Sequence, residues 1–429
     1  MWSALSFYNL FSDQAINDGF FYNQVLNKEE SSLENLGSLG GHQTLVLSIV
    51  CVAVFVVTSA GTKSLGKIGL VTLPLSFMLM VTLVIRSCLA PGGPHGIMTL
   101  LAPDWSQMSS PAAWMMAAQQ SVFSLQLGLG AVSAYSSYNN YHHNIVRDTA
   151  IMITCNFVWA ILSVLLMFSL LGVTHNLQTI NINHLPGDPG LVSITGNNVW
   201  LTGVTVVETA LANVTTGWLW AGLLFILIFI TTMTSLFGFL EVISSSIISI
   251  RPSLLRYKPA ITFSLLTFLF LMNLCLATQG GVHIYHLLHT YISTWPTLVT
   301  CLLTLLPVLL CHGQERLVTN IVDMSKVRLP HVVTCHLTVL YTSVAPVLLS
   351  CCLGFTLHRL SSYHLTQPLE TFNIDLPDWA MSTGWSLSLL PMSPIFLGAI
   401  VYLVWANKGV PRPAVRIDNL AMSVLNLSE

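Results

Sequence analysis

Polar side chains lie in the middle of an apolar stretch, residues 114–148, that is long enough to cross a membrane. Its polar and small residues are Gln120, Ser124, Gln126, Gly128 and Gly130, and a Ser-Tyr-Asn run follows at 137–139. Unpaired polar groups cost several kcal/mol in hydrocarbon, so a lipid-facing helix disfavours them. A broken helix that lines a cavity favours them, because its freed backbone groups can hold an ion or a polar substrate. The stretch therefore predicts the binding site of a transporter.

The composition of the chain is typical of a polytopic membrane protein. Charged residues make up 7% of the 429 residues and hydrophobic residues 53%, and the mean hydropathy is +0.72. Soluble domains contain roughly 25% charged residues, so the chain lies outside that class. The net charge of −2 and the lack of a basic run argue against a nucleic-acid partner. The lipid bilayer is the predicted environment.

Apolar runs predict nine membrane spans, since about 20 apolar residues suffice for one crossing. The predicted spans are 44–61, 68–90, 114–138, 150–172, 218–249, 260–278, 283–311, 333–357 and 383–406. Polar residues interrupt the third and the seventh of them, and Pro307 predicts a kink in the seventh. We expect a single transmembrane domain over 1–429, with its membrane region at 44–406.

Basic residues predict the orientation of these spans. One set of alternate loops holds Lys63, Lys67, Arg147, Arg251, Arg256, Lys258, Arg316, Lys326, Arg328, Lys408, Arg412 and Arg416, and the other holds Lys28, Arg86 and Arg359. Cytoplasmic loops carry the excess of positive charge. The segment 1–43 is therefore predicted to be extracellular and the tail 407–429 cytoplasmic. The outer loop 173–217 contains the sequon that begins at Asn213, a candidate glycosylation site.

Short landmarks follow one another along most of the chain in a distinctive order. They are Lys63–Lys67, Pro91-Gly92, Pro103-Asp104-Trp105, Trp114, Gln120, Phe123-Ser124-Leu125, Gly128, Gly130, Ser137-Tyr138-Asn139, Arg147-Asp148, Asn156, Ser235, Phe237, Glu241, Gly280-Gly281, Arg316, Asp378-Trp379 and Gly384-Trp385. In this order they resemble the neurotransmitter:sodium symporter family, whose members transport neurotransmitters and amino acids across the plasma membrane.

The resemblance implies an all-α polytopic membrane protein with the leucine-transporter-type inverted-repeat fold. In that fold two five-helix repeats hold the site between the broken first and sixth helices. The nine spans correspond to family helices 4–12, and nothing in this chain corresponds to helices one to three. The fold is therefore expected to be incomplete, with about half of the site on this polypeptide.

The resemblance also implies two sodium sites. Ser124 and Asn156 match positions that give oxygens to the first, and Thr231, Thr234 and Ser235 match the second. Sodium is a hard cation and is expected to need several oxygen ligands. The alternative is that these are small polar residues whose hydroxyls hydrogen-bond back to their own helix.

Chloride dependence is less well supported by the same comparison. Gln120, Ser124 and Asn156 match three of the four chloride positions, but the fourth is Ala160. Without that hydroxyl the anion lacks one donor. Chloride-independent members have an acidic residue at this position, which the chain also lacks.

The substrate positions depart further from the family pattern. Phe123 matches the aromatic residue that closes over the substrate and Ser235 keeps a hydroxyl. The departures are Gln126 at a small position, Leu129 at an aromatic one, and Leu236 and Phe239 at small or hydroxyl positions. Bulkier side chains shrink the cavity, so the substrate is expected to be small or unusual, or to be absent.

Histidines replace the family's outer gate. His289 aligns with an acidic residue of that gate, and His283 and His286 precede it at intervals of three. Three imidazoles can bind zinc, although such residues more often line the wet end of a helix. A histidine at the gate suggests the hypothesis of pH sensing.

Glu241 is the one acidic residue within a predicted span. A carboxylate at that depth needs a partner, so we expect it to be paired within the protein rather than to relay protons.

Two functions are compatible with these patterns. The first is sodium-coupled symport of an amino acid, a neurotransmitter or a related small amine. The second is a non-transporting membrane protein derived from the family that modulates a membrane-protein partner. No hydrolase or protease motif lies in the spans, so no enzyme activity is predicted.

Overall fold

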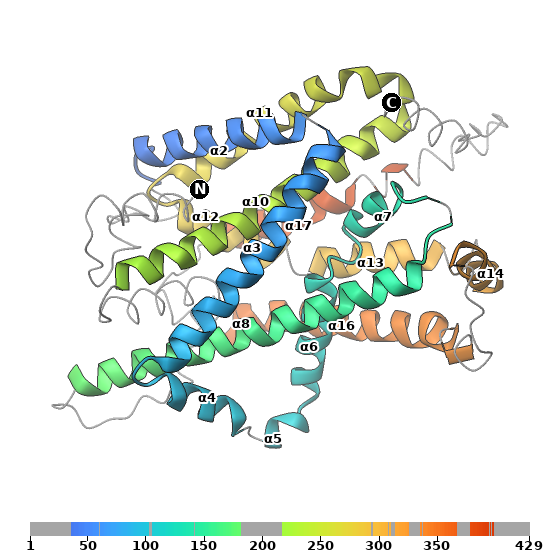
Figure 1. Cartoon of the computed structure of the whole chain (residues 1–429). Helices are drawn as coiled ribbons and strands as arrows, with labels where there is room; N and C mark the ends of the chain where they lie inside the picture. Colours follow the sequence, from blue (N-terminus) through green and yellow to red (C-terminus); the bar gives the residue numbers. More distant parts are fainter. Residues whose placement is uncertain are drawn as a thin grey trace.

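The computed structural model describes residues 36–59, 61–102, 105–140, 142–181, 217–292, 295–307, 309, 314–325, 335–336, 338–366, 378–393, 395 and 397–398, some of them by backbone alone. This part of the chain is helical (Figure 1), and an isolated antiparallel bridge joins Leu39 to Thr278. No strand occurs among the described residues. The predicted all-α class is confirmed.

The longer helices are α2 (Gly41–Ser59), α3 (Thr62–Leu89), α6 (Pro111–Ser124), α8 (Ile145–Asn181), α10 (Gly217–Ile250), α11 (Lys258–Leu274), α12 (Gly281–Ile292), α13 (Trp295–Pro307), α14 (Gln314–Ser325), α16 (Ala345–Thr366) and α17 (Asp378–Leu389). The shorter ones are α4 (Gly93–Leu101), α5 (Trp105–Met108), α7 (Ala131–Ser136), the 3₁₀ turns η3 (Pro252–Tyr257), η4 (Cys275–Ala277) and η7 (Leu390–Met392), and the π-helical turn η6 (Leu340–Val344).

Six helices among the described residues are long and apolar enough to cross a membrane. They are Gly41–Ser59, Ser64–Leu89, Ile145–Val173, Leu219–Ile250, Ser253–Ala277 and Leu340–Leu360. Each overlaps one of the nine predicted spans. The predicted span 114–138 is divided into α6 and α7, and the described parts of 283–311 are α12 and α13. Most of 383–406 lies outside the described residues, so the count of nine spans stays a prediction.

The predicted kink at Pro307 stays a prediction, because residue 308 and residues 293–294 of the seventh predicted span lie outside the described residues. Helix α12 ends at Ile292 and α13 begins at Trp295, with the buried Pro296 in its first turn. A proline in that position cannot donate to the preceding turn, so it begins a helix more readily than it continues one. Pro307, where a kink was predicted, is the last residue of α13.

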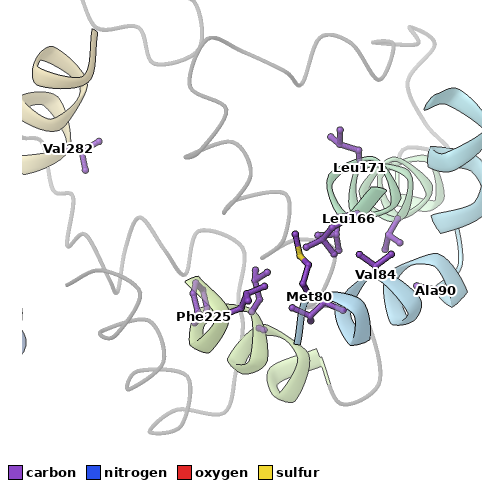
Figure 2. Packing of buried hydrophobic residues seen from close by; sticks show 13 residues of the cluster. Met80, Val84, Ala90, Leu166, Leu171, Phe225 and Val282 are labelled. Carbon is purple, nitrogen blue, oxygen red and sulfur yellow. The ribbon is translucent and has the colours of Figure 1, made fainter. Parts of the chain in front are cut away.

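The largest buried cluster joins α3, α8 and α10. Figure 2 shows Met80 and Val84 of α3 turned toward Leu166 of α8, with Phe225 of α10 beside them. Ser87 of α3 and Ser169 of α8 hydrogen-bond within this cluster at 2.6 Å. Burying one serine against another satisfies both hydroxyls, so the contact fixes the two helices without an unpaired polar group.

Glycines bring α4 against α8. A Cβ on Gly96 would lie 1.9 Å from the carbonyl oxygen of Phe168, and one on Gly172 would lie 2.4 Å from that of Gly92. The two backbones therefore touch directly, and any side chain at these positions would separate them.

Helix α2 lies along α11 (Figure 1), where Phe55 and Phe263 meet edge to face at 5.6 Å. Leu240 of α10 is buried in the same cluster, with Val54 and Leu266. A further cluster joins α6, α13 and α16 through Val122, Leu298 and Cys352. These contacts position the two sides of the candidate site.

Candidate functional site at the break between α6 and α7

Helix α6 ends at Ser124 and the helix resumes as α7 at Ala131 (Figure 1). Tight turns connect them, in which Gln126 N–H donates to the Phe123 carbonyl at 3.0 Å and Leu127 N–H to that of Val122 at 3.1 Å. The predicted break within 114–138 is confirmed. It opens the regular hydrogen-bond ladder at the position where the polar residues lie.

Three residues of this break adopt a left-handed backbone. Gly128 and Gly130 have φ of 78° and 80°, and Gln126 has φ of 51°, the single positive value for a non-glycine among the described residues. Glycine enters this region freely, whereas other residues do so at a cost of about 1–2 kcal/mol. Strained backbone of this kind concentrates at binding sites, so the conformation of Gln126 is consistent with a functional role for the break.

Gly128 brings the break into contact with α13. A Cβ at this position would lie 2.8 Å from both the Cα and the nitrogen of Cys301. Only a glycine allows the two backbones to approach this closely. The break is therefore held against α13 rather than projecting freely.

The two residues predicted for the first sodium site are in contact. Asn156 of α8 donates from Nδ2 to Ser124 Oγ at 3.0 Å, although 32 residues separate them. Ser124 in turn donates to the Ser121 carbonyl at 3.2 Å. The serine oxygen and the amide of Asn156 thus lie together at the end of α6, where the first sodium site is predicted.

The residues predicted for the second sodium site lie on α10. Thr231, Thr234 and Ser235 donate their hydroxyl protons to carbonyls one turn earlier, at 2.9 Å, 2.7 Å and 3.1 Å. This is the back-bonded arrangement named as the alternative to sodium binding. The hydroxyl oxygens keep free electron pairs for a cation, so both interpretations stay open.

The chloride candidates share the same neighbourhood only in part. Ser124 and Asn156 are in contact, and Gln120 lies one turn before Ser124 on an exposed part of α6. Ala160 is exposed on α8, one turn after Asn156. No hydroxyl is present there to donate to an anion, and the doubt about chloride dependence stays a prediction.

The predicted substrate residues divide between the break and α10. Phe123 and Gln126 are half-buried and Leu129 is 39% exposed. Gly238 lies on the side of α10 that faces α7, because a Cβ at this position would lie 3.2 Å from the hydroxyl of Tyr135 in α7. Residues three or four apart share a helix face; Ser235 lies three positions before Gly238 and is on that side.

Leu236 and Phe239, the other two substrate candidates, are half-buried on α10. Leu236 packs against the cluster between α2, α10 and α11. It therefore contributes to helix packing, and its assignment to the pocket stays a prediction.

Glu241 is paired, as expected. Its side chain is 2% exposed, and Oε1 accepts from Lys258 Nζ at 2.6 Å and from the Tyr138 hydroxyl at 2.8 Å. The contact joins the residues after α7 to α10 and to the start of α11. Pairing neutralises a buried charge that would otherwise be very costly. The sequence predicts Lys258 only as one of the basic residues of a cytoplasmic loop, because nothing in the order of residues links it to Glu241.

The histidines of α12 do not assemble into a metal site among the side chains that the structure describes. His283 is 6% exposed, whereas His289 is exposed and stacks on Tyr285 with ring centroids 5.8 Å apart. No group of three histidine, cysteine or acidic side chains suited to a metal occurs in the described part. The side chain of His286 and the sequon at Asn213 lie outside it.

Comparison with known proteins decides the family. The model of the sodium:neurotransmitter symporter family matches residues 4–406, which is nearly the whole chain. The chain belongs to this family. It is therefore a multi-pass membrane protein of a transporter family that couples transport to sodium, and the resemblance drawn from its landmarks is confirmed.

Curated relatives within the symporter family include transporters of two small molecules. The chain is 29% identical over 380 residues to the sodium- and chloride-dependent creatine transporter 1 of Bos taurus and 28% identical to that of Homo sapiens, covering 87% of this chain and 56% of each relative. It is 25% identical over 368 residues to the sodium- and chloride-dependent glycine transporter 2 of Xenopus laevis, covering 85% of this chain and 44% of the relative. The chain thus spans about half the length of the curated relatives it matches.

Proposed function

We propose that this chain takes part in sodium-coupled symport of a small zwitterionic solute related to an amino acid or to creatine. The observation that carries the proposal is the contact between Ser124 and Asn156 at the break after α6. Two side chains from separate helices there supply oxygen atoms beside an unwound backbone. The printed names of the relatives, creatine and glycine transporters, support the solute class.

In this proposal sodium binds at Ser124 and Asn156, with Thr231, Thr234 and Ser235 as the second site. Phe123 and Gln126 contact the solute, with Leu129, Ser235, Leu236 and Phe239 as further candidates. Chloride is not required, because Ala160 offers no donor. The protein lies in the plasma membrane as one transmembrane domain, with its amino terminus outside and its carboxyl terminus in the cytoplasm.

The test is sodium-dependent binding and uptake by the full chain in proteoliposomes. Radiolabelled glycine and creatine are offered in sodium or choline buffer. Ser124→Ala and Asn156→Ala are expected to weaken sodium binding, measured as the sodium concentration for half-maximal uptake, about tenfold or more, because each removes an oxygen ligand. Ser163→Ala is the matched control, because that hydroxyl bonds only to its own helix at Trp159.

A second candidate function is a non-transporting protein that modulates a membrane partner. It is favoured by the exposure of helix α8. Only 6% of the apolar stretch within Ile145–Val173 is buried inside the protein, and Ala160 of this helix is exposed. Sodium-independent binding without uptake in either buffer would contradict symport and support this candidate. Sodium-dependent uptake by the chain alone would exclude it.

A further inference from the structure

Helices α4 and α5 lie outside the bundle, between the end of α3 and the start of α6. Figure 1 shows both of them below α8 in the view. Each helix exposes two large apolar side chains, which are Met98 at 70%, Leu101 at 74%, Trp105 at 71% and Met108 at 51%. An exposed apolar surface of this kind marks contact with another molecule or with lipid.

The exposed side chains of each helix lie on one face. Met98 and Leu101 are three positions apart in α4, and Trp105 and Met108 are three apart in α5, so each pair is adjacent on its helix surface. The buried residues of α4 are Gly93 and Gly96, on the opposite side. Helix α4 therefore packs on α8 through its glycines and turns an apolar face away from the bundle.

A stacked arginine and tryptophan mark the membrane boundary beside α4. Arg86, in the last turn of α3, lies over the Trp220 ring at the start of α10, 5.4 Å from the ring centroid. Both residue types concentrate where hydrocarbon gives way to headgroups. The next residue, Ser87, hydrogen-bonds Ser169 of α8. Ser169 is therefore close to the level of this boundary.

Helix α4 lies at the same level. A Cβ on Gly96 would collide with the carbonyl oxygen of Phe168, which adjoins Ser169. Phe168 comes five residues before Val173, where the apolar stretch of α8 ends. Five residues of α-helix rise about 7.5 Å. Helix α4 is thus beside the last turns of this apolar stretch, and its exposed face is at the depth of the lipid interface.

The charges of this region indicate a neutral lipid. No lysine or arginine lies between Arg86 and Arg147 in the sequence, and Asp104 is the single acidic residue of that stretch. A surface that recognises anionic headgroups carries a cluster of basic residues. Binding here must therefore come from apolar area and from the preference of tryptophan for the interface.

Helix α5 is tied to α6. Trp114, at the start of α6, donates from Nε1 to the Met108 carbonyl at 2.8 Å, and its side chain is also exposed. The indole N–H is satisfied inside the protein, so the ring is held in a fixed orientation beside α5. Helix α6 continues from here to the break at Ser124. An anchor at α5 thus fixes the depth of the end of α6 that is predicted to face outside.

We propose that α4 and α5 bind the interface of a neutral phospholipid leaflet, as an in-plane anchor for the outer end of α6. Met98, Leu101, Trp105 and Met108 enter the boundary between headgroups and acyl chains, about 5–10 Å deep. The proposal is independent of solute and sodium binding, because none of these four residues is a candidate for either site.

The test is quenching of tryptophan fluorescence in the full chain, with one chain in each nanodisc. The phosphatidylcholine is brominated either near the headgroup or near the end of the acyl chain. The chain has 11 tryptophans, so Trp105 is measured as the difference between the unaltered chain and Trp105→Phe. Bromine near the headgroup is expected to quench this difference about twofold more strongly, because the ring lies within roughly 5–10 Å of the boundary.

Trp159→Phe is the matched control. Trp159 lies in the middle of the apolar stretch Ile145–Val173 and packs against the cluster that joins α3, α8 and α10. Its contribution should show the opposite preference, for bromine near the chain end. Leu101→Trp adds a reporter to α4 without removing a tryptophan, and its added emission should show the same depth as Trp105.

Three results would overturn the proposal. If neither brominated lipid quenches Trp105 or the reporter at position 101, this surface faces water or a protein partner. Stronger quenching by bromine near the chain end would place the segment in hydrocarbon rather than at the interface. Loss of quenching when two chains share a nanodisc would assign the surface to a second copy. Brominated phosphatidylglycerol should quench no more strongly than phosphatidylcholine, and a clear preference for it would overturn the choice of a neutral lipid.

Discussion

Lys258→Met is expected to destabilise the fold strongly, because it leaves the Glu241 carboxylate without its cation. Glu241 is 2% exposed and the Lys258 side chain 19% exposed, so water can replace little of the lost contact. Removing one partner of a buried ion pair costs about 3–5 kcal/mol in the free energy of unfolding. Tyr138→Phe leaves the ion pair intact and removes one hydrogen bond. Tyr138 is 41% exposed, so a loss of about 1 kcal/mol is expected.

The double variant Glu241→Leu with Lys258→Leu removes both charges of the ion pair together. Because neither charge then remains buried alone, the double variant should be more stable than Lys258→Met. The measurement is unfolding of the full chain in mixed micelles on titration with dodecyl sulfate, followed by tryptophan fluorescence. If Lys258→Met unfolds within about 1 kcal/mol of the unaltered chain, the ion pair does not stabilise the fold and the reasoning fails.

Two further predictions concern backbone positions. Gly96→Ala is expected to cost about 1–3 kcal/mol, because its Cβ would meet the Phe168 carbonyl, whereas Gly354→Ala, with nothing within 4 Å, should be neutral or stabilising in the same assay. Gln126→Gly is expected to relieve about 1 kcal/mol of left-handed backbone strain. Gln126→Ala keeps the strain and should not gain that stability. Equal stability of the two variants would refute a strained backbone at this position.

The interrupted third span illustrates what the sequence predicts well. Polar residues and glycines within an apolar run indicated a broken helix at 114–138, and α6 does end at Ser124. The signal is local, because a backbone in hydrocarbon must satisfy its hydrogen bonds within the segment or line a cavity.

The seventh span illustrates a signal that the sequence leaves ambiguous. Both Pro296 and Pro307 lie in the predicted span 283–311, the first in the opening turn of α13 and the second as its last described residue. A proline is compatible with a kink, a first turn or an end. Which of these occurs depends on the packing of α12 and α13 against their neighbours, and this is not encoded in the run of apolar residues.

By itself the sequence determined the membrane class, most of the helices and the family, because hydropathy and short motifs are properties of neighbouring residues. The tertiary structure decided which side chains meet. Asn156 reaches Ser124, Lys258 reaches Glu241 and Arg359 reaches Met116 only because separate helices pack side by side. Such contacts depend on how whole helices cross and on which faces meet. Successive side chains on a helix point about 100° apart, so a shift of one residue along the helix removes the contact.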